Sequence, residues 1–429
     1  MKVLRPEDKG YKKAIAALGR RAAPDPEVRA VVAKILAAVG SKGDAALIRY
    51  TKKFGGPALT AVQIPVAPAE TARAIAELPA ETRRAIFAAR TNVRNFARRS
   101  LRKSWFMKNR QGAVVGERFD PFRRVGIYIP GGTAPLVSSA IMTCTLAAAA
   151  GVPEIVAVTP AGKNGAVHPA LLAALAGCGA TEIYRVGGAQ AIAALAFGTK
   201  TIRPVQKIFG PGNAFVVEAK RQVFGRVAVD LLPGPSEVLV IADHSAEPEW
   251  IAADLLAQSE HGPGSQAVLV TDSRKILSSV KKALARQIKL SKRPKELAAG
   301  LKNATLVLVP DRDSAVRLAN DFASEHVSIA TAQPGEIALQ LTTSGGIFLG
   351  GLSPVAGGDF LAGPSHELPT GGAGRSFAGL TVDQFQRRTS VVMFDKPSLR
   401  ASLPFLETFS RIEGLDAHGR SARIRLEKK

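Results

Sequence analysis

Cysteine is scarce in this chain of 429 residues, which contains only two. Cys144 and Cys178 both stand among small apolar residues. Two cysteines cannot form the set of bridges that stabilises a small secreted domain, and isolated cysteines in apolar contexts are usually buried and unreactive. The sequence therefore excludes a disulfide scaffold and predicts two buried thiols.

Long hydrophobic runs are also missing. The longest candidate, residues 140–158, is interrupted by two threonines, a glycine, a proline and a glutamate. A membrane-spanning helix needs about 20 mostly apolar residues, so we expect no membrane span. The first residues, MKVLRPEDKGYKKAIAALGRR, lack the apolar centre of a secretory signal and include acidic Glu7 and Asp8. We therefore expect a cytoplasmic protein.

The chain has fewer acidic residues than basic ones, with 35 Asp and Glu against 58 Lys and Arg, which gives a net charge of +23. Residues 1–110 hold 24 basic and 8 acidic residues, which places +16 of that charge there. A solvated basic face, a general attraction of anionic partners and nucleic-acid binding are the open interpretations. The arginines of residues 80–103 have helical spacing with few aromatic residues and no nucleic-acid-binding motif, which favours a solvated face.

The apolar residues that are present predict an α/β fold. At 46% hydrophobic residues the chain can bury a large core and divide into two or more domains. From residue 125, β-branched runs alternate with Ala- and Leu-rich stretches of helical period, a pattern typical of parallel sheets. We expect nine strands, too many for one ordinary sheet unit, at residues 125–129, 154–159, 182–186, 226–230, 237–243, 266–272, 304–310, 327–331 and 346–350.

Glycine-rich turns interrupt the first half of this region. They are Pro130-Gly131-Gly132, Gly187-Gly188, Gly210-Pro211-Gly212-Asn213 and Gly234-Pro235-Ser236. Glycine lets backbone N–H groups approach an anion at the start of a helix, so these turns predict a nucleotide- or phosphate-binding layer. No G-x-G-x-x-G motif follows a strand, and a purely conformational role stays open for each turn.

A long Gly- and Pro-rich segment, residues 351–377, follows the predicted strands. Ordered loops of this length are usually functional. Beyond it we expect a helical stretch from about residue 381 and a small C-terminal piece.

Histidine is rare as well, with six residues, yet two of them end an identical tripeptide. In the first copy, Ser259-Glu260-His261, periodicity predicts a helix over residues 246–261 that Gly262-Pro263 ends. Gln258 and His261 then lie three residues apart in the last turn, on one face, where an amide oxygen and an imidazole can share a metal ion. The alternative is a favourable charge at the C-terminus of a helix.

The second copy, Ser324-Glu325-His326, closes a predicted helix over residues 313–326 and runs into a strand. Adjacent residues in such a junction point apart, so Glu325 and His326 can serve two steps as acid and base. A structural pair is the alternative. Asp359, after two glycines in the long loop, adds an oxygen donor that zinc accepts, and His418 adds an imidazole near the terminus.

In this order, the segments resemble the histidinol dehydrogenase family. The resemblance covers roughly residues 22–425 and rests on VGIYIPGGTAPL, VGGAQAIAALAFGT, KIFGPGNAFVVEAK, DLLPGPSEVLVIAD, AQSEHGPGSQ, SEHVSI, GDFLAGPSHELPTGG and EGLDAHGRSARIR. It implies a zinc- and NAD-dependent oxidation of L-histidinol to L-histidine, with L-histidinal retained between two hydride transfers. The alternative is a paralogous dehydrogenase of another small primary alcohol, such as a sulfonated diol.

The resemblance also implies roles for single residues. His326 corresponds to the catalytic base and Glu325 to the residue that activates water. Zinc ligands would be Gln258, His261, Asp359 and His418. The substrate contacts would be these four together with His326, Ser236 and Glu413, and the NAD contacts would be Tyr128, Gln190 and Asn213. His366 matches a family histidine that we interpret as supporting the loop.

The implied architecture is two α/β domains with incomplete Rossmann-like parallel sheets, one inserted into the other. Residues 126–235 would form the inserted NAD-binding domain, and residues 22–125 with 236–380 the domain that carries most metal and catalytic residues. Residues 1–21 with 381–429 would form a small terminal unit. In a swapped homodimer this unit would complete the partner's active site.

Overall fold

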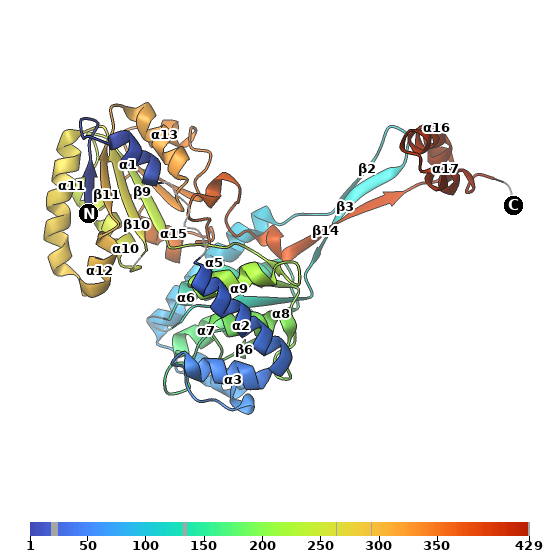
Figure 1. Ribbon diagram of the computed structural model, residues 1–429, viewed down its shortest axis with the longest axis horizontal. Helices are drawn as coiled ribbons and strands as arrows, with labels where there is room; N and C mark the ends of the chain where they lie inside the picture. Colours follow the sequence, from blue (N-terminus) through green and yellow to red (C-terminus); the bar gives the residue numbers. More distant parts are fainter. Residues whose placement is uncertain (19–24, 132–134, 263, 293, 428–429) are drawn as a thin grey trace.

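Two parallel sheets and one antiparallel ribbon organise the chain in the computed structural model, which describes residues 1–18, 25–131, 135–262, 264–292 and 294–427 (Figure 1). The expected α/β class with parallel sheets is confirmed. Gly132, Pro263 and the expected boundary between residues 21 and 22 lie outside the described residues. Within the described ranges, no helix is long and apolar enough to cross a membrane.

The five-stranded sheet has the strand order β6-β5-β4-β7-β8. Its strands are β4 (Arg124–Tyr128), β5 (Glu154–Val158), β6 (Glu182–Tyr184), β7 (Lys207–Phe209) and β8 (Ala228–Val229). Its connecting helices are α6 (Val137–Ala149), α7 (Pro169–Gly177), α8 (Gly188–Phe197) and α9 (Ala214–Val223). One core lies under α6 and α7 and another under α8 and α9, so strands such as β4 are buried on both faces and read as continuous apolar runs.

The six-stranded sheet has the order β1-β11-β10-β9-β12-β13, and every pair is parallel. Its strands are β1 (Lys2–Leu4), β9 (Glu237–Ala242), β10 (Gln266–Thr271), β11 (Thr305–Leu308), β12 (His326–Ala330) and β13 (Gly346–Leu349). The helices are α10 (Pro248–Ser259), α11 (Arg274–Gln287) and α12 (Pro294–Leu301) on one face, and α1 (Tyr11–Leu18), α13 (Arg312–Phe322) and α14 (Pro334–Ala338) on the other. Apart from β1, the strand order matches that of the other sheet. In both sheets the strand that comes first in the sequence is central, the next two in the sequence lie on one side of it and the last two lie on the other.

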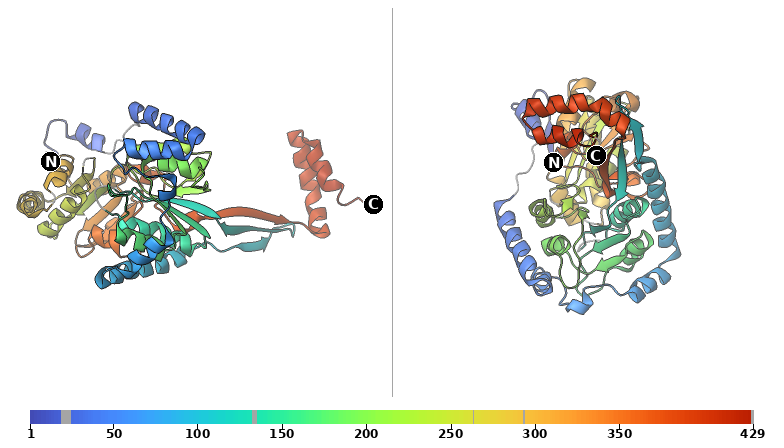
Figure 2. Two further views of the ribbon diagram at one scale, coloured as in Figure 1. Left: turned by 90° about the horizontal axis from the view of Figure 1, so that it is seen from below. Right: turned by 90° about the vertical axis from the view of Figure 1, so that its right-hand side faces the viewer.

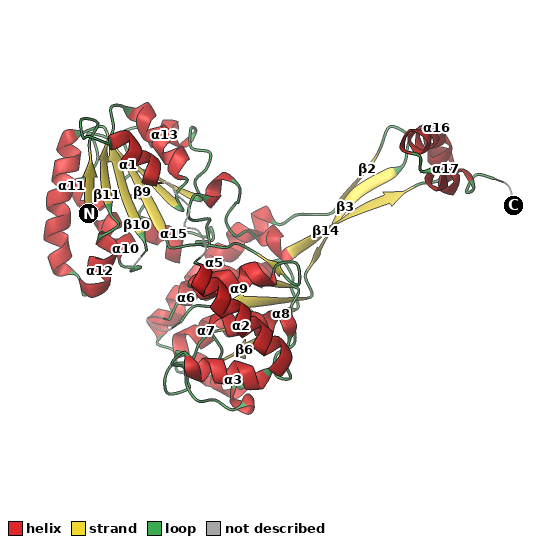
Figure 3. Ribbon diagram, in the orientation of Figure 1, coloured by secondary structure: helices red, strands yellow, loops and turns green. Residues whose placement is uncertain are grey.

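An antiparallel ribbon extends away from both sheets (Figures 1 and 2). It consists of β2 (Trp105–Lys108), β3 (Val114–Pro121) and β14 (Gln386–Met393), and it leads to the helix pair α16 (Lys396–Glu413) and α17 (Asp416–Arg423) (Figure 3). We call the ribbon and the helix pair the arm. The helix pair exposes large apolar side chains, among them Phe405, Phe409 and Ile412.

All nine predicted strands are present, whereas β1, β2, β3, β7 and β14 were not predicted. Strands β1 and β7 have three residues each, too few to show a period, and β2 is exposed along its whole length. The expectation of a helical stretch from about residue 381 is wrong. A short 3-10 turn, Val382–Phe385, leads directly into β14, whose β-branched residues pair with β3.

Two parts of the chain lie elsewhere than the sequence suggested. Helices α2 (Pro26–Lys42), α3 (Asp44–Lys53), α4 (Pro68–Ala76) and α5 (Ala80–Ser100) pack on the helices of the five-stranded sheet instead of joining residues 236–380. Strand β1 pairs with the edge strand β11 and α1 covers the same sheet, so residues 2–18 are not part of a terminal unit. An edge strand leaves backbone groups unpaired, and β1 satisfies those of β11.

Two smaller expectations concern the cysteines and the basic region. Cys144 and Cys178 are both buried free thiols, as predicted. Helix α5 buries Ala89, Val93 and Ala97, while most of its arginines are exposed. This distribution supports a solvated basic face.

Candidate active site

The candidate site lies where the carboxyl ends of the five-stranded sheet approach the amino ends of the six-stranded sheet. The loop after β13 connects the two edges through Glu367, which is buried. Burial raises the pKa of this carboxyl well above its usual value, and the charges of Asp230 and Glu325 add to the effect. Asp230 directly follows β8, and Glu325 directly precedes β12, so Glu367 stands between the two edges.

The second Ser-Glu-His copy is at the centre of this region. His326 is the first residue of β12 and is 5% exposed. Its Nδ1 lies 3.1 Å from the carbonyl oxygen of Glu237, and the Glu237 N–H donates to Oε2 of Glu325 at 2.9 Å. The backbone N–H and C=O of one residue, Glu237 at the start of β9, thus hold both side chains. Because a carbonyl oxygen only accepts, Nδ1 carries a proton, and Nε2 of the neutral ring is left to accept one.

The environment of this pair changes its protonation. Burial raises the pKa of Glu325 to about 7, although the neighbouring His326 lowers it. Burial disfavours the charged imidazole of His326, but the carboxylates of Glu325 and Asp359 outweigh that effect and raise its pKa to about 9. The Nε2 atom lies 3.5 Å from Oδ1 of Asp359. A buried carboxylate that titrates near neutrality next to an imidazole is typical of acid–base chemistry.

Three of the four candidate metal ligands belong to this side of the molecule. Gln258 is in the last turn of α10 and is 4% exposed, and its Nε2 has no hydrogen-bond partner among the described residues. Asp359 lies in the short helix α15 (Val355–Phe360). Burial raises the pKa of its carboxyl, but His326, His366 and His261 lie close enough to lower it overall.

The placement of His261 differs from the prediction. Helix α10 ends at Ser259, so His261 lies in the turn beyond it, where its N–H donates to the Gln258 carbonyl at 3.3 Å. Gln258 is buried whereas His261 is exposed, so the two do not share a helical face. The helix thus ends at Ser259 instead of residue 261, and Gly262, with a φ of +89°, follows the turn.

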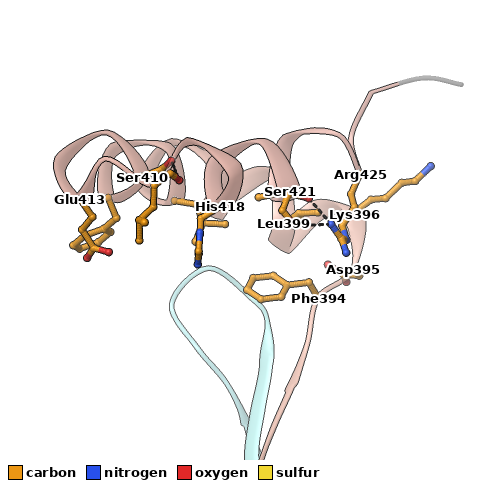
Figure 4. Close-up of a pocket in the computed structure, with 13 residues that line it drawn as sticks. Phe394, Asp395, Lys396, Leu399, Ser410, Glu413, His418, Ser421 and Arg425 are labelled. Atoms are coloured by element: carbon orange, nitrogen blue, oxygen red, sulfur yellow. Dashed lines mark hydrogen bonds between the residues drawn. The ribbon is translucent and has the colours of Figure 1, made fainter.

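The fourth candidate ligand is far from these three. His418 is on α17, and Glu413 ends α16. Both line a cleft of about 660 Å³ in the arm, where they project from the same side of the helix pair (Figure 4). Across the described part of the chain, no three His, Cys, Asp or Glu side chains are grouped so that they could hold a metal ion. The arm of one chain therefore does not bring His418 or Glu413 to Asp359.

The candidate NAD contacts gather at the carboxyl edge of the five-stranded sheet. Tyr128 ends β4, and its hydroxyl accepts from the Gly188 N–H at 3.1 Å. Gln190, in the first turn of α8, is buried with its Oε1 unpartnered, and Asn213 caps α9. At Gly210, with a φ of +107°, a Cβ would lie 2.1 Å from the Tyr128 carbonyl oxygen. Glycine is thus required for the backbone to pass this close to β4.

Ser236 and His366 support the same region from two sides. Ser236 directly precedes β9, and its side chain lowers the pKa of Glu325 by hydrogen bonding. The Nδ1 of His366 lies 2.8 Å from the Asp359 carbonyl oxygen and its Nε2 lies 3.2 Å from Oγ of Ser139. His366 therefore connects the loop that carries Asp359 to α6 of the other sheet.

The sequence analysis missed two buried carboxyls, Glu237 and Glu367. Burial raises the pKa of Glu237 to about 7, and its backbone positions Glu325 and His326. The available signal was a charged residue at the start of the apolar run EVLVIAD. Glu367 had no local signal, because its burial depends on contacts between two sheets.

Comparison with known proteins gives a consistent result. A family model described as histidinol dehydrogenase matches residues 18–426. A curated histidinol dehydrogenase of Rhizobium meliloti (strain 1021) is 44% identical over 401 residues, 93% of this chain and 92% of that protein. One of Geobacillus kaustophilus (strain HTA426) is 43% identical over 403 residues, 94% and 95% of the two chains. The crystal structure of a histidinol dehydrogenase from Elizabethkingia anophelis matches with a TM-score of 0.93 at 33% identity, covering 99% of this chain and 98% of that chain. The similarity therefore includes both sheets and the arm.

Proposed function

The chain belongs to the histidinol dehydrogenase family of oxidoreductases, and we propose that it oxidises L-histidinol to L-histidine in two NAD-dependent steps, with L-histidinal held between them. These are the last steps of histidine biosynthesis. The observation that carries the proposal is the buried Glu325–His326 pair, held by the backbone N–H and C=O of Glu237 at the start of β9.

The first step needs a base for the hydroxyl proton of histidinol. In the neutral ring, Nε2 of His326 is the free acceptor, because Nδ1–H is held by the Glu237 carbonyl. Because the pKa of His326 is raised to about 9, this neutral form predominates in alkaline solution, where the base is most effective. As His326 takes the proton, a hydride leaves the carbinol carbon for NAD⁺, and histidinal and NADH result. Tyr128, Gln190 and Asn213 would hold NAD at the carboxyl edge of the five-stranded sheet, where the helix N-termini favour phosphate.

The second step needs a base for water. Glu325, with a pKa of about 7, is ionised in a useful fraction at neutral pH and can take a proton from water as it attacks the aldehyde carbon. A second hydride then passes to a second NAD⁺, and the carboxylate of histidine forms. The two members of the pair thus act in different steps.

The residues also fit one zinc ion per subunit. Gln258, His261 and Asp359 from one chain and the partner's His418 would supply an amide oxygen, two imidazoles and a carboxylate, which zinc accepts. The buried Gln258 amide, with Nε2 unpartnered, is consistent with a side chain that faces a ligand. When bound, zinc would orient the amino and imidazole nitrogens of the substrate.

The arm supports a swapped homodimer with shared active sites. It exposes Phe405, Phe409 and Ile412 at 57%, 63% and 74%, more apolar surface than an isolated helix pair would leave in water. Docking on a second copy would bury these side chains and bring His418 and Glu413 to the partner's Asp359. Ser236 would contact the substrate from the other chain.

The charge of Glu413 separates histidinol from the alternative substrates. Its carboxylate suits the cationic amine or imidazole of histidinol and would repel a sulfonated diol. The test is to incubate zinc-replete protein with NAD and L-histidinol and to count NADH formed per substrate consumed. Two NADH support the four-electron oxidation; one NADH, or turnover of the sulfonated diol alone, would contradict it.

A further inference from the structure

The carboxyl edge of the six-stranded sheet contains a cleft that the proposed chemistry does not use. In open parallel sheets, ligands bind outside the carboxyl ends of the strands, at the point where the strand order reverses. Here the order β11-β10-β9-β12-β13 reverses between β9 and β12. A cleft of about 280 Å³ lies at that point, next to the last residues of β9 and to the residues that follow β12.

The floor of this cleft is apolar and its rim is polar. Ile241, Ala315 and Ile337 form the floor and are 1–3% exposed. Asp272, at the end of β10, and Thr331, after β12, lie on the rim. An apolar floor with a few polar groups is typical of small-molecule sites, and roughly 300 Å³ is the lower end of their size range.

Most polar groups around the cleft are already paired. Asp243 accepts from the Ala332 N–H at 3.0 Å and from the Ser245 N–H at 2.9 Å, which ties β9 to the end of β12. Arg312 donates to Glu336 at 2.8 Å. These residues form the walls and have little capacity for a ligand.

Asp272 and Thr331 are among the groups that remain available, and the exposed His244 also lines the cleft. Asp272 is exposed and makes no hydrogen bond or ion pair with any residue that the structure describes. The Thr331 hydroxyl oxygen is buried and, within the same residues, has no partner. A buried hydroxyl without a partner is costly, and a ligand in the cleft would satisfy it.

The turn between β9 and α10 does not favour phosphate. It contains no glycine between Ala242 and Pro248, and α10 carries Glu249 in its first turn, whereas α11 starts at the same edge with Arg274 and Lys275 and no acidic residue. At the corresponding edge of the other sheet, α6, α8 and α9 have no acidic residue in the first turn. The turn at the end of β9 therefore offers a phosphate less than the glycine-rich turns of the other sheet do.

We propose that this cleft is a second binding site, for an unphosphorylated nucleoside. The carboxylate of Asp272 occupies the position, at the end of the second strand, where an acidic side chain accepts hydrogen bonds from a ribose diol. The base lies on the apolar floor formed by Ile241, Ala315 and Ile337, and the Thr331 hydroxyl meets a polar atom of the ligand. The site is separate from the Glu325–His326 pair, which lies at the opposite ends of the same strands.

Equilibrium dialysis of the full-length protein with labelled adenosine tests the proposal. Excess NAD is present throughout, so that the five-stranded sheet is occupied by its own ligand. We expect saturable binding of one adenosine per chain. Adenosine that is fully displaced by NAD, or that does not bind at millimolar concentration, would overturn the proposal.

Ligand analogues and variants identify the contacts. We expect 2′,3′-dideoxyadenosine to bind about tenfold more weakly or worse, because it lacks the diol, and AMP to bind more weakly than adenosine. Asp272→Asn and Thr331→Val should each weaken adenosine binding. The matched control is Asp313→Asn, an exposed carboxylate of α13 outside the cleft.

The outcomes are distinct from a failure of the proposed oxidation. Equal affinity for adenosine in wild type and in both Asp272→Asn and Thr331→Val would contradict the site, and so would tighter binding of AMP. None of these measurements depends on turnover of histidinol. An inactive protein that binds adenosine through Asp272 would still support the second site.

Discussion

The two parallel sheets share one strand order, apart from β1, but the proposed mechanism uses opposite edges of them. In the five-stranded sheet the carboxyl edge carries the glycine-rich turns and Tyr128, while the amino edge carries an ion-pair network. In the six-stranded sheet the amino edge carries Glu237 and His326, the first residues of β9 and β12. The shared topology thus does not determine which edge of a sheet carries reactive groups. The side chains at the strand ends determine it.

The opposition of the two edges has a functional consequence. In the proposed mechanism, a cofactor at the carboxyl edge of one sheet and a base at the amino edge of the other would face the same space, and Glu367 lies near both edges. Hydride transfer requires the donor carbon and the nicotinamide to be in contact. The arrangement therefore assigns one reactant to each sheet.

The largest effect is expected from removing the base at the amino edge of the six-stranded sheet. His326→Asn removes Nε2, the proposed proton acceptor. We expect kcat of both oxidation steps to fall about 10²–10⁴-fold, the usual contribution of a general base. Steady-state NADH formation from histidinol and from supplied histidinal measures this. The control is His168→Asn, which replaces the exposed residue that caps α7 by another good capping residue. If His326→Asn retained both activities, the base would not lie at this edge.

A smaller and selective effect is expected at Glu325. Glu325→Gln keeps the shape but removes the carboxylate, so oxidation of histidinal should fall by about 10²-fold or more while the alcohol step is largely kept. Single-turnover measurements with each substrate separate the steps. Glu260→Gln, at the exposed equivalent position of the first Ser-Glu-His copy, should leave both steps unchanged. An equal loss in both steps for Glu325→Gln would assign it a role other than water activation.

The third prediction tests whether the arm completes the amino edge of a second copy. His261→Asn and His418→Asn should each be nearly inactive. Co-refolded at equal ratio, they should recover roughly a quarter of wild-type activity, since half of the dimers are mixed and half of their sites are intact. Differential tags show that mixed dimers are present. No recovery in such dimers would place His418 in its own chain's site.

The smallest effect concerns the amino edge of the five-stranded sheet. Arg124, Glu154 and Glu182 are the first residues of β4, β5 and β6, and Arg124 donates to both carboxylates at 2.6–2.7 Å. Hydrogen bonding to Arg124 lowers the pKa of Glu182 to about 2. Because the folded pKa is below the unfolded one, this stabilisation is complete above about pH 4.5 and is lost as pH falls towards 2.

Glu182→Gln should therefore reduce the free energy of unfolding by about 1–3 kcal/mol at pH 7 and by less at pH 3. Denaturant titration at the two pH values measures the difference. Glu336→Gln in the exposed Arg312–Glu336 pair is the control, with an expected change of about 1 kcal/mol or less. A larger loss for Glu182→Gln at pH 3 than at pH 7 would contradict the assignment. An effect on the oxidation steps alone would show that this edge is not structural.

The sequence predicted the parts of the fold that have a local period. The nine apolar strands, including the start of β9 at Glu237, follow from β-branched runs and their flanks. His326 was predicted to end a helix over residues 313–326, whereas α13 ends at Phe322 and His326 begins β12. Strands β1 and β14 could not be predicted in the same way, because pairing with β11 and β3 over long sequence distances stabilises them. The packing of α2 to α5 on the five-stranded sheet depends likewise on tertiary contacts.

The candidate site could be predicted where its reactive residues belong to a sequence motif. Glu325 and Asp359 each lie within 4 Å of His326. The Ser-Glu-His motif predicted the Glu325–His326 pair, although with the two side chains pointing apart. Glu367 was not found, because only the meeting of two sheets buries it. His261 lies beyond the helix end because α10 stops at Ser259, and periodicity does not give a helix end to within two residues.

A crystal structure of the protein with NAD and L-histidinol is the most direct test of the opposition between the two edges. We expect the nicotinamide ring beside Tyr128 and Gly188 at the carboxyl edge of the five-stranded sheet, with the carbinol carbon between it and Nε2 of His326. A dinucleotide bound instead at the carboxyl edge of the six-stranded sheet, beside Asp272, would contradict this account.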